Sequence, residues 1–251
     1  MKTQEKNFDG IKLSGFTAIL IMLALTGTAI YLLSLPQTPS IIAGVICGIC
    51  VVVMLPGFMI IQPNNSRVLT FFGRYAGTVI SNGFYWVNPL FLKSTVTLRI
   101  LNLNIDPIKV NDKVGNPIMI GAVVVWRIKD TYKASFDISG NIREFVQIQS
   151  DAALRQVAGM YAYDTNETID KVTLRSDESG EITQRLEDEL NSRLAIAGIE
   201  IVEARINYLA YASEIASVML RRQQADAIIS ARERIVEGAV SLSLIHISEP
   251  T

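Results

Sequence analysis

The chain has 251 residues, 49% of them hydrophobic, and a formal net charge of −1. This length allows one large domain or two small ones, and a near-neutral charge argues against a nucleic-acid-binding protein, which would show a basic field. With only two cysteines, a disulfide framework is excluded.

The first segment of the chain is free of charge over a long stretch. Between Lys12 and Arg67 there is no Asp, Glu, Lys or Arg. One helical crossing of a bilayer needs about 20 apolar residues, so this stretch is long enough for two. Pro36 and Pro39 divide it, because proline removes an N–H donor and clashes with the preceding turn of a helix. We therefore expect a transmembrane hairpin over residues 13–62.

The two crossings are expected at about residues 13–35 and 41–61. A cleaved signal peptide is one alternative, but the first crossing is too long for the apolar part of such a peptide. A buried core hairpin is another, but soluble helices normally show a polar face. Gly44 and Gly48 lie four residues apart in the second crossing and are candidates for helix packing, since small residues let backbones approach closely in lipid. Generic small residues in an apolar helix are the alternative.

The orientation of the hairpin follows from its flanking charges. Basic residues precede the first crossing and follow the second, and the connecting loop has none: Lys2, Lys6, Lys12, Arg67 and Arg74. The positive-inside rule places such flanks in the cytoplasm. We therefore predict a multi-pass protein of the cell membrane, with a cytoplasmic tail at residues 1–12 and a cytoplasmic soluble domain.

No residue pattern of an enzyme or a metal site is recognised. Cys47 and Cys50 have C-x-x-C spacing, but no further Cys and no nearby His completes a zinc site, so we interpret them as small apolar residues of the second crossing. Four acidic residues of a later loop lack calcium-ligand spacing and predict a solvated loop: Asp164, Asp170, Asp177 and Glu178. Phosphate-binding glycine loops, nucleophile elbows and dinucleotide fingerprints are absent from the sequence. We expect no catalytic residue, metal or cofactor.

From residue 63 to residue 129 the pattern is that of β-structure. Strands are predicted at residues 67–73, 95–100 and 118–129, from alternation and β-branched composition. The alternation changes phase at Ile100–Leu101, which predicts a β-bulge. The segment 111–117 is rich in turn-forming residues and predicts a hairpin connection.

Beyond Asp130 the apolar period becomes helical. A helix is predicted over 142–157, with Asn141 or Ser139 as its N-cap. A second is expected over 181–197, followed by a C′ glycine, Gly198. A strand at 199–206 and a third helix from Ser213 complete the pattern. Mixed elements of this kind predict an α+β fold.

Several segments in this order resemble the SPFH superfamily, also called band-7, of stomatins, prohibitins and flotillins. They are Gln62–Val68, Phe72–Thr78, Gly83–Pro89, Val110–Ile118 and Leu209–Ala216, which leads into Arg221–Ala225. The resemblance spans about residues 61–241 and is greatest to bacterial members with a two-helix anchor. It implies an SPFH domain over residues 63–212, with an antiparallel β part and an α/β part, and then a long C-terminal helix.

The resemblance also implies a function. Such proteins assemble into large rings or cages on membranes and modulate channels and membrane proteases. The favoured expectation is a membrane-anchored, non-enzymatic scaffold that homo-oligomerises and organises membrane microdomains or membrane-protein complexes. The alternative is a dedicated regulatory subunit of one membrane protease or channel, and a neighbouring protease gene would favour it. A membrane-bound hydrolase is disfavoured because no nucleophile–base pair is recognised.

Two groups of residues are candidates for these roles. Three aromatic residues after the anchor could lie at the lipid headgroup boundary, or alternatively in a β-domain core: Phe84, Tyr85 and Trp86. Phe91, in a short loop around residues 89–92, could also dip into that interface. The helix at 213–241 has too little apolar surface to fold alone, and its charges could pair between copies: Arg221, Arg222, Asp226, Arg232, Glu233, Arg234 and Glu237.

Residues 242–251 do not continue the charged pattern of that helix. They resemble the translation of a transposon-derived sequencing adapter, so we expect them to be non-native and the natural protein to continue past Ser241. His246, the only histidine, would then be foreign. A natural C-terminal peptide is the alternative.

Overall fold

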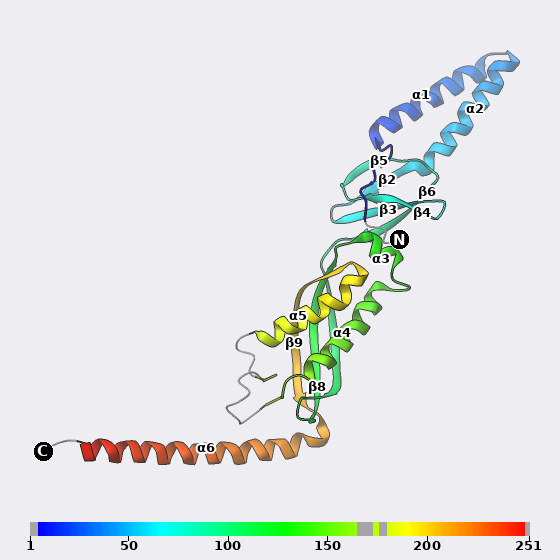
Figure 1. The fold of residues 1–251 in the computed structure, drawn as a ribbon. Helices are drawn as coiled ribbons and strands as arrows, with labels where there is room; N and C mark the ends of the chain where they lie inside the picture. The colour runs from blue at the N-terminus through cyan, green and yellow to red at the C-terminus, as the bar shows by residue number, and fades with distance from the viewer. Residues whose placement is uncertain (1–4, 165–172, 176–179, 249–251) are drawn as a thin grey trace. The chain divides into compact units, whose positions relative to one another are not determined.

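The computed structural model describes residues 5–164, 173–175 and 180–248, with side chains described as far as Ser241. The chain forms two compact units. The first comprises Met1–Leu101, Trp126–Phe145 and Arg193–Glu200, and the second Asn102–Val125, Val146–Ser192 and Ile201–Thr251. Figure 1 shows the elements of both.

The first unit begins with the expected helical hairpin. Helix α1 covers Gly15–Ser34 and helix α2 covers Thr38–Met54, and the two pack against each other. The predicted end of the second crossing at residue 61 is wrong. Pro56 cannot donate a backbone hydrogen bond, and the helix gives way to a 3-10 turn, η1 (Leu55–Gly57), and then to strand β2 (Phe58–Ile61).

Two small antiparallel sheets follow in the first unit, and together they form what we call the β part. In one, the strand order is β1-β5-β2, with β1 at Leu13–Ser14 and β5 at Gly83–Trp86. In the other it is β4-β3-β6, formed by Arg74–Val79, Asn65–Phe71 and Phe91–Thr97. The predicted strand at 67–73 thus starts and ends two residues earlier than expected.

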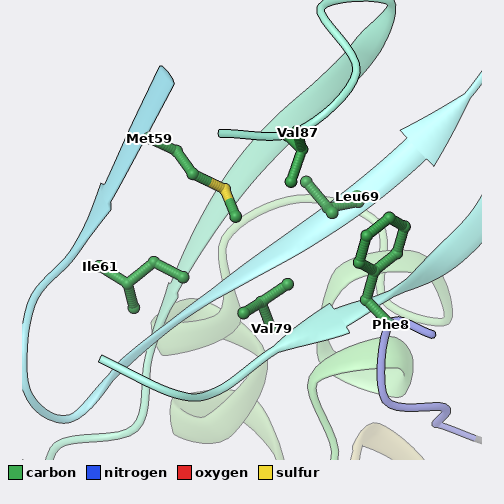
Figure 2. Packing of buried hydrophobic residues seen from close by; sticks show 6 residues of the cluster. All are labelled: Phe8, Met59, Ile61, Leu69, Val79 and Val87. Carbon is green, nitrogen blue, oxygen red and sulfur yellow. The ribbon is translucent and has the colours of Figure 1, made fainter. Parts of the chain in front are cut away.

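Side chains from both sheets meet in one hydrophobic core (Figure 2). Its buried members are Phe8, Met59, Ile61, Leu69, Val79 and Val87. Phe8 comes from the segment before the hairpin, so this described part of the segment contributes to the folded β part.

The third sheet has the order β7-β8-β9, from Leu101–Asn111, Pro117–Ile128 and Ile199–Tyr211. The predicted hairpin connection between β7 and β8 is confirmed. The Asp112 carboxylate closes that turn by accepting hydrogen bonds from the backbone N–H groups of Val114 (3.0 Å) and Asn116 (2.7 Å). The predicted bulge at residues 100–101 is wrong, because β6 ends at Thr97 in one sheet and β7 begins at Leu101 in another.

Helix α4 (Ile142–Ala158) confirms the prediction at 142–157, and Asn141 Oδ1 caps it by accepting from the Arg143 N–H at 2.9 Å. A short helix, α3 (Thr131–Phe136), was not expected. Helix α5 (Glu181–Leu194) and a 3-10 turn, η2 (Ala195–Ala197), cover the second predicted helix. Gly198 follows with φ of 68°, as a C′ glycine does.

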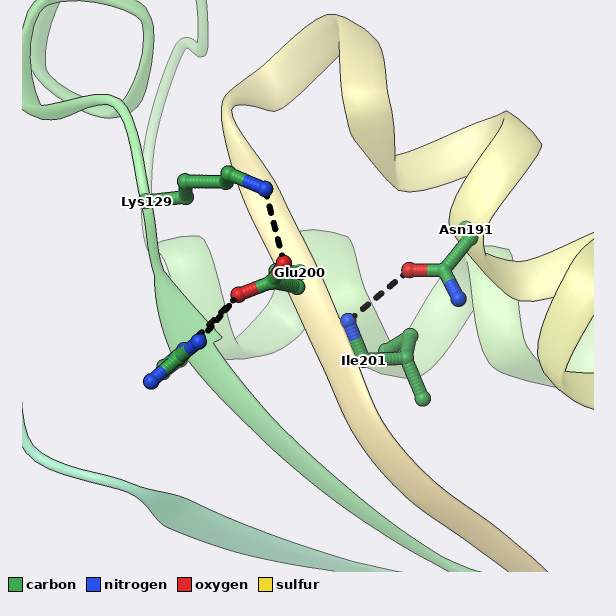
Figure 3. A network of polar contacts seen from close by, with 5 residues as sticks. Lys129, Asn191, Glu200 and Ile201 are labelled. Atoms are coloured by element: carbon green, nitrogen blue, oxygen red, sulfur yellow. Dashed lines mark hydrogen bonds and ion pairs between the residues drawn. The ribbon is translucent and has the colours of Figure 1, made fainter.

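Helix α5 also supports strand β9, which lies at an edge of its sheet. The α5 side chains of Asn191 and Glu187 accept hydrogen bonds from the β9 backbone N–H groups of Ile201 (3.0 Å) and Ala204 (3.1 Å); Figure 3 shows the Asn191 contact. Unpaired strand edges are prone to pair with other chains. The two α5 side chains bond to part of the free edge of β9.

The last element is helix α6, Ser213–Ser248. It begins where predicted, but it continues through residues 242–248, so the backbone does not mark a change at Ser241. That those residues are non-native stays a prediction. The whole is an α+β fold with two apolar N-terminal helices and a long C-terminal helix.

Candidate membrane-anchoring and assembly sites

The buried residues of α1 and α2 are small. Ala18, Ala29 and Gly44 are buried, and small residues let helices approach closely. Gly15 is buried too, but against Phe84 of β5. Only 11% of each apolar helix window is buried inside the protein, so the pair is not the core of a soluble domain. Each apolar span has 20 residues, about 30 Å of helix, which matches the thickness of a bilayer's hydrocarbon core.

The two candidate packing glycines lie in different surroundings. A Cβ atom on Gly44 would lie 2.8 Å from Leu33 Cγ and 3.2 Å from the Ala29 carbonyl oxygen, so Gly44 sits at the α1–α2 contact. A Cβ atom on Gly48 would meet nothing within 4 Å. The structure therefore brings only Gly44 to the hairpin contact.

Both ends of the hairpin pair with the same strand. Residues Leu13 and Ser14, just before α1, pair with Trp86 and Tyr85 of β5. On the other edge of β5, Phe58 and Met59 pair with the same two residues. The start of α1 and the end of α2 are thus held side by side, so the hairpin leaves the β part and returns to it.

Two side chains bond to the backbone where α2 ends. Trp86 Nε1 donates to the Met54 carbonyl oxygen at 2.9 Å. Lys93 Nζ donates to the carbonyl oxygens of Pro56 and, at 3.3 Å, Phe58. The last carbonyl groups of a helix lack intrahelical donors and favour a cation, so these contacts satisfy carbonyl groups at and just beyond the end of α2. Burial, and then the nearby Arg67 charge, lower the pKa of the Lys93 ammonium group.

The segment before α1 is fixed to the β part by a chain of hydroxyl groups. The Phe8 N–H donates to the Thr78 carbonyl oxygen at 3.1 Å. The Thr78 hydroxyl lies 2.7 Å from that of Tyr75 and 2.9 Å from that of Thr131. Thr131 in turn donates to Glu5 Oε1 at 2.6 Å. The first turn of helix α3 therefore contributes to holding the N-terminal segment.

The four candidate interface aromatics separate into two places. Phe84 packs between the ends of the hairpin, stacked on Phe58 and edge-on to Phe16, each at a centroid distance of 5.6 Å. Tyr85 and Trp86 follow it on β5 and are half-buried. Phe91 packs instead against the hydrophobic core, 5.4 Å from Phe8.

The N-terminal part of α6 is fixed within the second unit. Lys109 pairs with Glu214, and the hydrogen bond from Lys109 lowers the pKa of the Glu214 carboxyl. Gln223 donates to Asp164 Oδ2 at 3.2 Å. Asp164 also pairs with Arg175 at 3.0 Å, so this acidic residue serves as a structural contact. Asp170, Asp177 and Glu178 lie outside the described residues.

Further along α6, every described side chain from 227 to 241 is exposed. The candidate assembly charges are exposed, apart from Asp226, which is half-buried and lies 3.9 Å from Arg222. The structure thus does not bring Arg221, Arg232, Glu233, Arg234 and Glu237 into an intramolecular site.

The exposed apolar residues of α6 repeat with a period that sequence reasoning missed. Val218, Ile229 and Val240 are spaced by eleven residues, and Ala225 and Val236 repeat the same spacing. Together these five residues form one stripe of alternating seven- and four-residue steps, whereas Leu220, Ile228 and Ile235, which are also exposed, lie off it. An eleven-residue repeat corresponds to 3.67 residues per turn and suits helices that pack nearly straight or with a right-handed supercoil.

Among the described residues, no group of three or more His, Cys, Asp or Glu could hold a metal ion. A comparison with protein-family models then decides the family. Residues 59–239 match the model of the SPFH domain / Band 7 family. The chain belongs to this family. A search of curated proteins found no match.

In this SPFH protein the family match starts within β2 and extends along α6. The family is generally non-enzymatic and membrane-associated. Sequence reasoning missed Lys93 and the N-terminal segment as parts of the anchor. The Phe8 contact had no local signal, because its partners in the core, from Met59 to Phe91, lie far along the chain. Pro56–Gly57 could have indicated the end of α2, since both residues break helices.

Proposed function

We propose that this SPFH protein is a membrane-anchored, non-enzymatic scaffold that homo-oligomerises and organises membrane microdomains or membrane-protein complexes. The observation that carries the proposal is the fully exposed stretch of α6 with its apolar stripe. A helix of this kind gains stability by packing with other helices. The two apolar helices confine all copies to one plane, which favours repeated contacts between neighbours.

The charges beside the stripe favour copies of the same chain as partners. Basic and acidic side chains alternate along α6, as in Arg232, Glu233, Arg234 and Glu237. An exposed ion pair contributes only roughly 0.2–1 kcal/mol, so pairs alone would not hold an assembly together. Burial of the apolar stripe between helices stabilises the assembly more strongly, by about 25 cal/mol per Å² of apolar surface.

The assembly is tested by particle size in mild detergent, measured by native mass and negative-stain imaging. We expect the protein carrying α6 to form large homo-oligomers, and a chain ending at Ala212 to be smaller. Ile229→Glu places a charge in the stripe and should reduce particle size. Ala231→Glu adds the same charge outside the stripe and serves as its control. Unchanged size after removal of α6 would exclude the helix as the assembly element.

The alternative is a dedicated regulatory subunit of one membrane protease or channel. In that case a client should co-purify at a fixed ratio after crosslinking, and deletion of the gene should change that client's activity alone. A scaffold should instead retain several membrane proteins, and its self-association should not depend on any of them.

The cytoplasmic orientation is part of the proposal and rests on the flanking basic residues. The pairing of both hairpin ends with β5 supports only a common side for the N-terminal segment and the β part, because it requires an even number of crossings between them. The basic residues assign that side to the cytoplasm. The same pairing favours retention of the N-terminal segment over its cleavage as a signal peptide.

A further inference from the structure

The charge of this protein is unevenly distributed along the chain. Although the net charge is −1, the stretch from Gly10 to Ile105 contains no Asp or Glu. It contains five basic residues: Lys12, Arg67, Arg74, Lys93 and Arg99. All five lie in the first unit, which also carries the apolar hairpin. A basic region beside a membrane anchor is attracted to anionic lipid.

Within this basic unit lies a cavity of about 340 Å³. It is lined by Ile60 and Ile61 of β2, by Gln62 and Asn65 of the following turn, and by Arg67 and Thr95. One wall is therefore apolar, and the others offer amide groups, a hydroxyl group and a guanidinium group. This combination suits a ligand with an anionic head and an apolar body.

The local backbone explains how these polar groups come together. The Asn65 N–H donates to the Gln62 carbonyl oxygen at 3.1 Å, which closes a turn. Pro63 occupies its second position, and Asn64 its third with φ of 59°, a conformation that Asn tolerates better than most residues. The turn leads directly into β3, where Arg67 pairs with Thr95 of β6. Two strands and a rigid turn thus fix the walls of the cavity.

The charge of Arg67 is not neutralised within the described part of the chain. Arg67 forms no ion pair among the described residues, and its positive charge helps to lower the pKa of Lys93. Lys93 itself donates to backbone carbonyl groups rather than to a carboxylate. Two neighbouring cations without a counter-ion repel each other, and an anion bound beside Arg67 would relieve that repulsion.

We infer that this cavity binds a phosphate oxyanion through Arg67, and that the phosphate belongs to the headgroup of an anionic phospholipid. An Arg guanidinium matches phosphate geometry with two parallel hydrogen bonds. The lipid assignment follows from the position of Ile60, which is 64% exposed on the cavity wall. Only the short turn η1 separates its strand from α2. The inference rests on membrane insertion of the hairpin but not on assembly through α6.

The test uses the full chain in mild detergent, with bound lipid measured by native mass spectrometry. Phosphatidylglycerol is added as the anionic probe and phosphatidylcholine as the zwitterionic one. We expect one phosphatidylglycerol to be retained in preference, and Arg67→Gln to weaken its binding roughly ten- to hundred-fold, as loss of a charge-assisted hydrogen bond would. Arg99→Gln removes the same charge from an exposed position outside the cavity and should retain the lipid.

A second variant keeps the test decisive if Arg67→Gln fails to fold. Thr95→Val changes an exposed cavity residue with little change in volume and should also weaken binding. Equal loss of phosphatidylglycerol binding in the Arg67 and Arg99 variants would show that binding depends only on overall positive charge. That result would overturn the assignment of the cavity as the binding site. Binding of inorganic phosphate without phosphatidylglycerol would overturn the lipid assignment. Particle size, measured on the same samples, reports separately on the proposed assembly.

Discussion

At the scale of single residues, the two tryptophans of this protein form a natural comparison. The indole N–H of Trp86 donates to the Met54 carbonyl oxygen at the end of α2. The N–H of Trp126, which is 3% exposed, has no partner among the described residues. Replacement by Phe removes the donor at either position but removes a hydrogen bond only at the first.

We therefore expect Trp86→Phe to destabilise the protein by about 0.5–1.5 kcal/mol through loss of this hydrogen bond, a contribution that Trp126→Phe lacks. Trp126→Phe should instead destabilise the protein by leaving space in the core, because a smaller ring replaces a buried indole. The measurement is the unfolding free energy in detergent, followed by circular dichroism against denaturant. A loss of less than about 0.5 kcal/mol in Trp86→Phe would mean that the Trp86 hydrogen bond does not support the end of the helix.

Glu200 gives a prediction about pH. It accepts hydrogen bonds from Lys129 Nζ and Arg127 Nε, each at 2.8 Å; Figure 3 shows the Lys129 contact. These bonds, that from Lys129 first, hold the pKa of the carboxyl below its usual 4.5. A carboxyl with a lowered pKa in the folded state adds stability above the unfolded-state value, and that stability is lost as the pH falls through the folded-state value.

Glu200→Gln should therefore lower the melting temperature near neutral pH, and the difference from wild type should shrink as the pH falls below about 4.5. Thermal unfolding measured between neutral and acidic pH tests this. Asp188→Asn, at an exposed position of α5, controls for the loss of one negative charge. A constant difference across the whole pH range would contradict the assigned role.

At the scale of elements, the hairpin contact depends on the absence of a side chain at one position. Gly44→Leu should force α1 and α2 apart, because even a Cβ atom there would lie 2.8 Å from Leu33. Overpacking typically costs about 1–3 kcal/mol. Gly48→Leu makes the same change where space is open and should leave the hairpin intact.

The distance between the helices can be followed with paired labels on α1 and α2 in both variants. A wider separation in Gly44→Leu alone is the expected result. If Gly48→Leu also separates the helices or blocks assembly, Gly48 has a contact beyond the hairpin, and the assignment of Gly44 as the packing position would need revision.

The elements show which parts of the fold can be predicted from sequence. The two apolar helices, strand β8, helices α4 and α5 and the αL glycine at 198 were predicted because their signals are local and periodic. The phase change at Ile100–Leu101 was misinterpreted, since a bulge and a move into another sheet produce the same pattern. Strand β1 has only two residues, too few for any period.

The candidate sites likewise divide into features with a local sequence signal and features without one. Composition predicted the hairpin, and charge predicted the exposed face of α6. The contacts that close the anchor could not be predicted, because Phe8 with Phe91, and Lys93 with Pro56, are joined only by the tertiary fold. The cavity at Arg67 likewise needs the register of β3 with β6, which places Thr95 opposite it.

At the scale of the whole molecule, the orientation can be tested by labelling of single cysteines in intact cells. With Cys47 and Cys50 replaced by Ala, Gln37→Cys lies in the loop between the crossings, and Asn82→Cys lies in the exposed turn before β5. A membrane-impermeant reagent added outside should label Gln37→Cys alone. Labelling of Asn82→Cys from outside would show that the orientation is the opposite of the one proposed.

The pairing of both hairpin ends with β5 also sets an order of events during synthesis. Asn7 and Leu13 leave the ribosome first, but their partners, Thr78 and Trp86, follow more than 70 residues later. At about 5–20 residues per second, that interval lasts several seconds. Both helices are complete by then, so insertion can precede closure of the β part. A chain that inserts only one of the two helices leaves its two ends on opposite sides of the bilayer. It cannot then bury Phe8, so completed folding of the β part excludes a half-inserted hairpin.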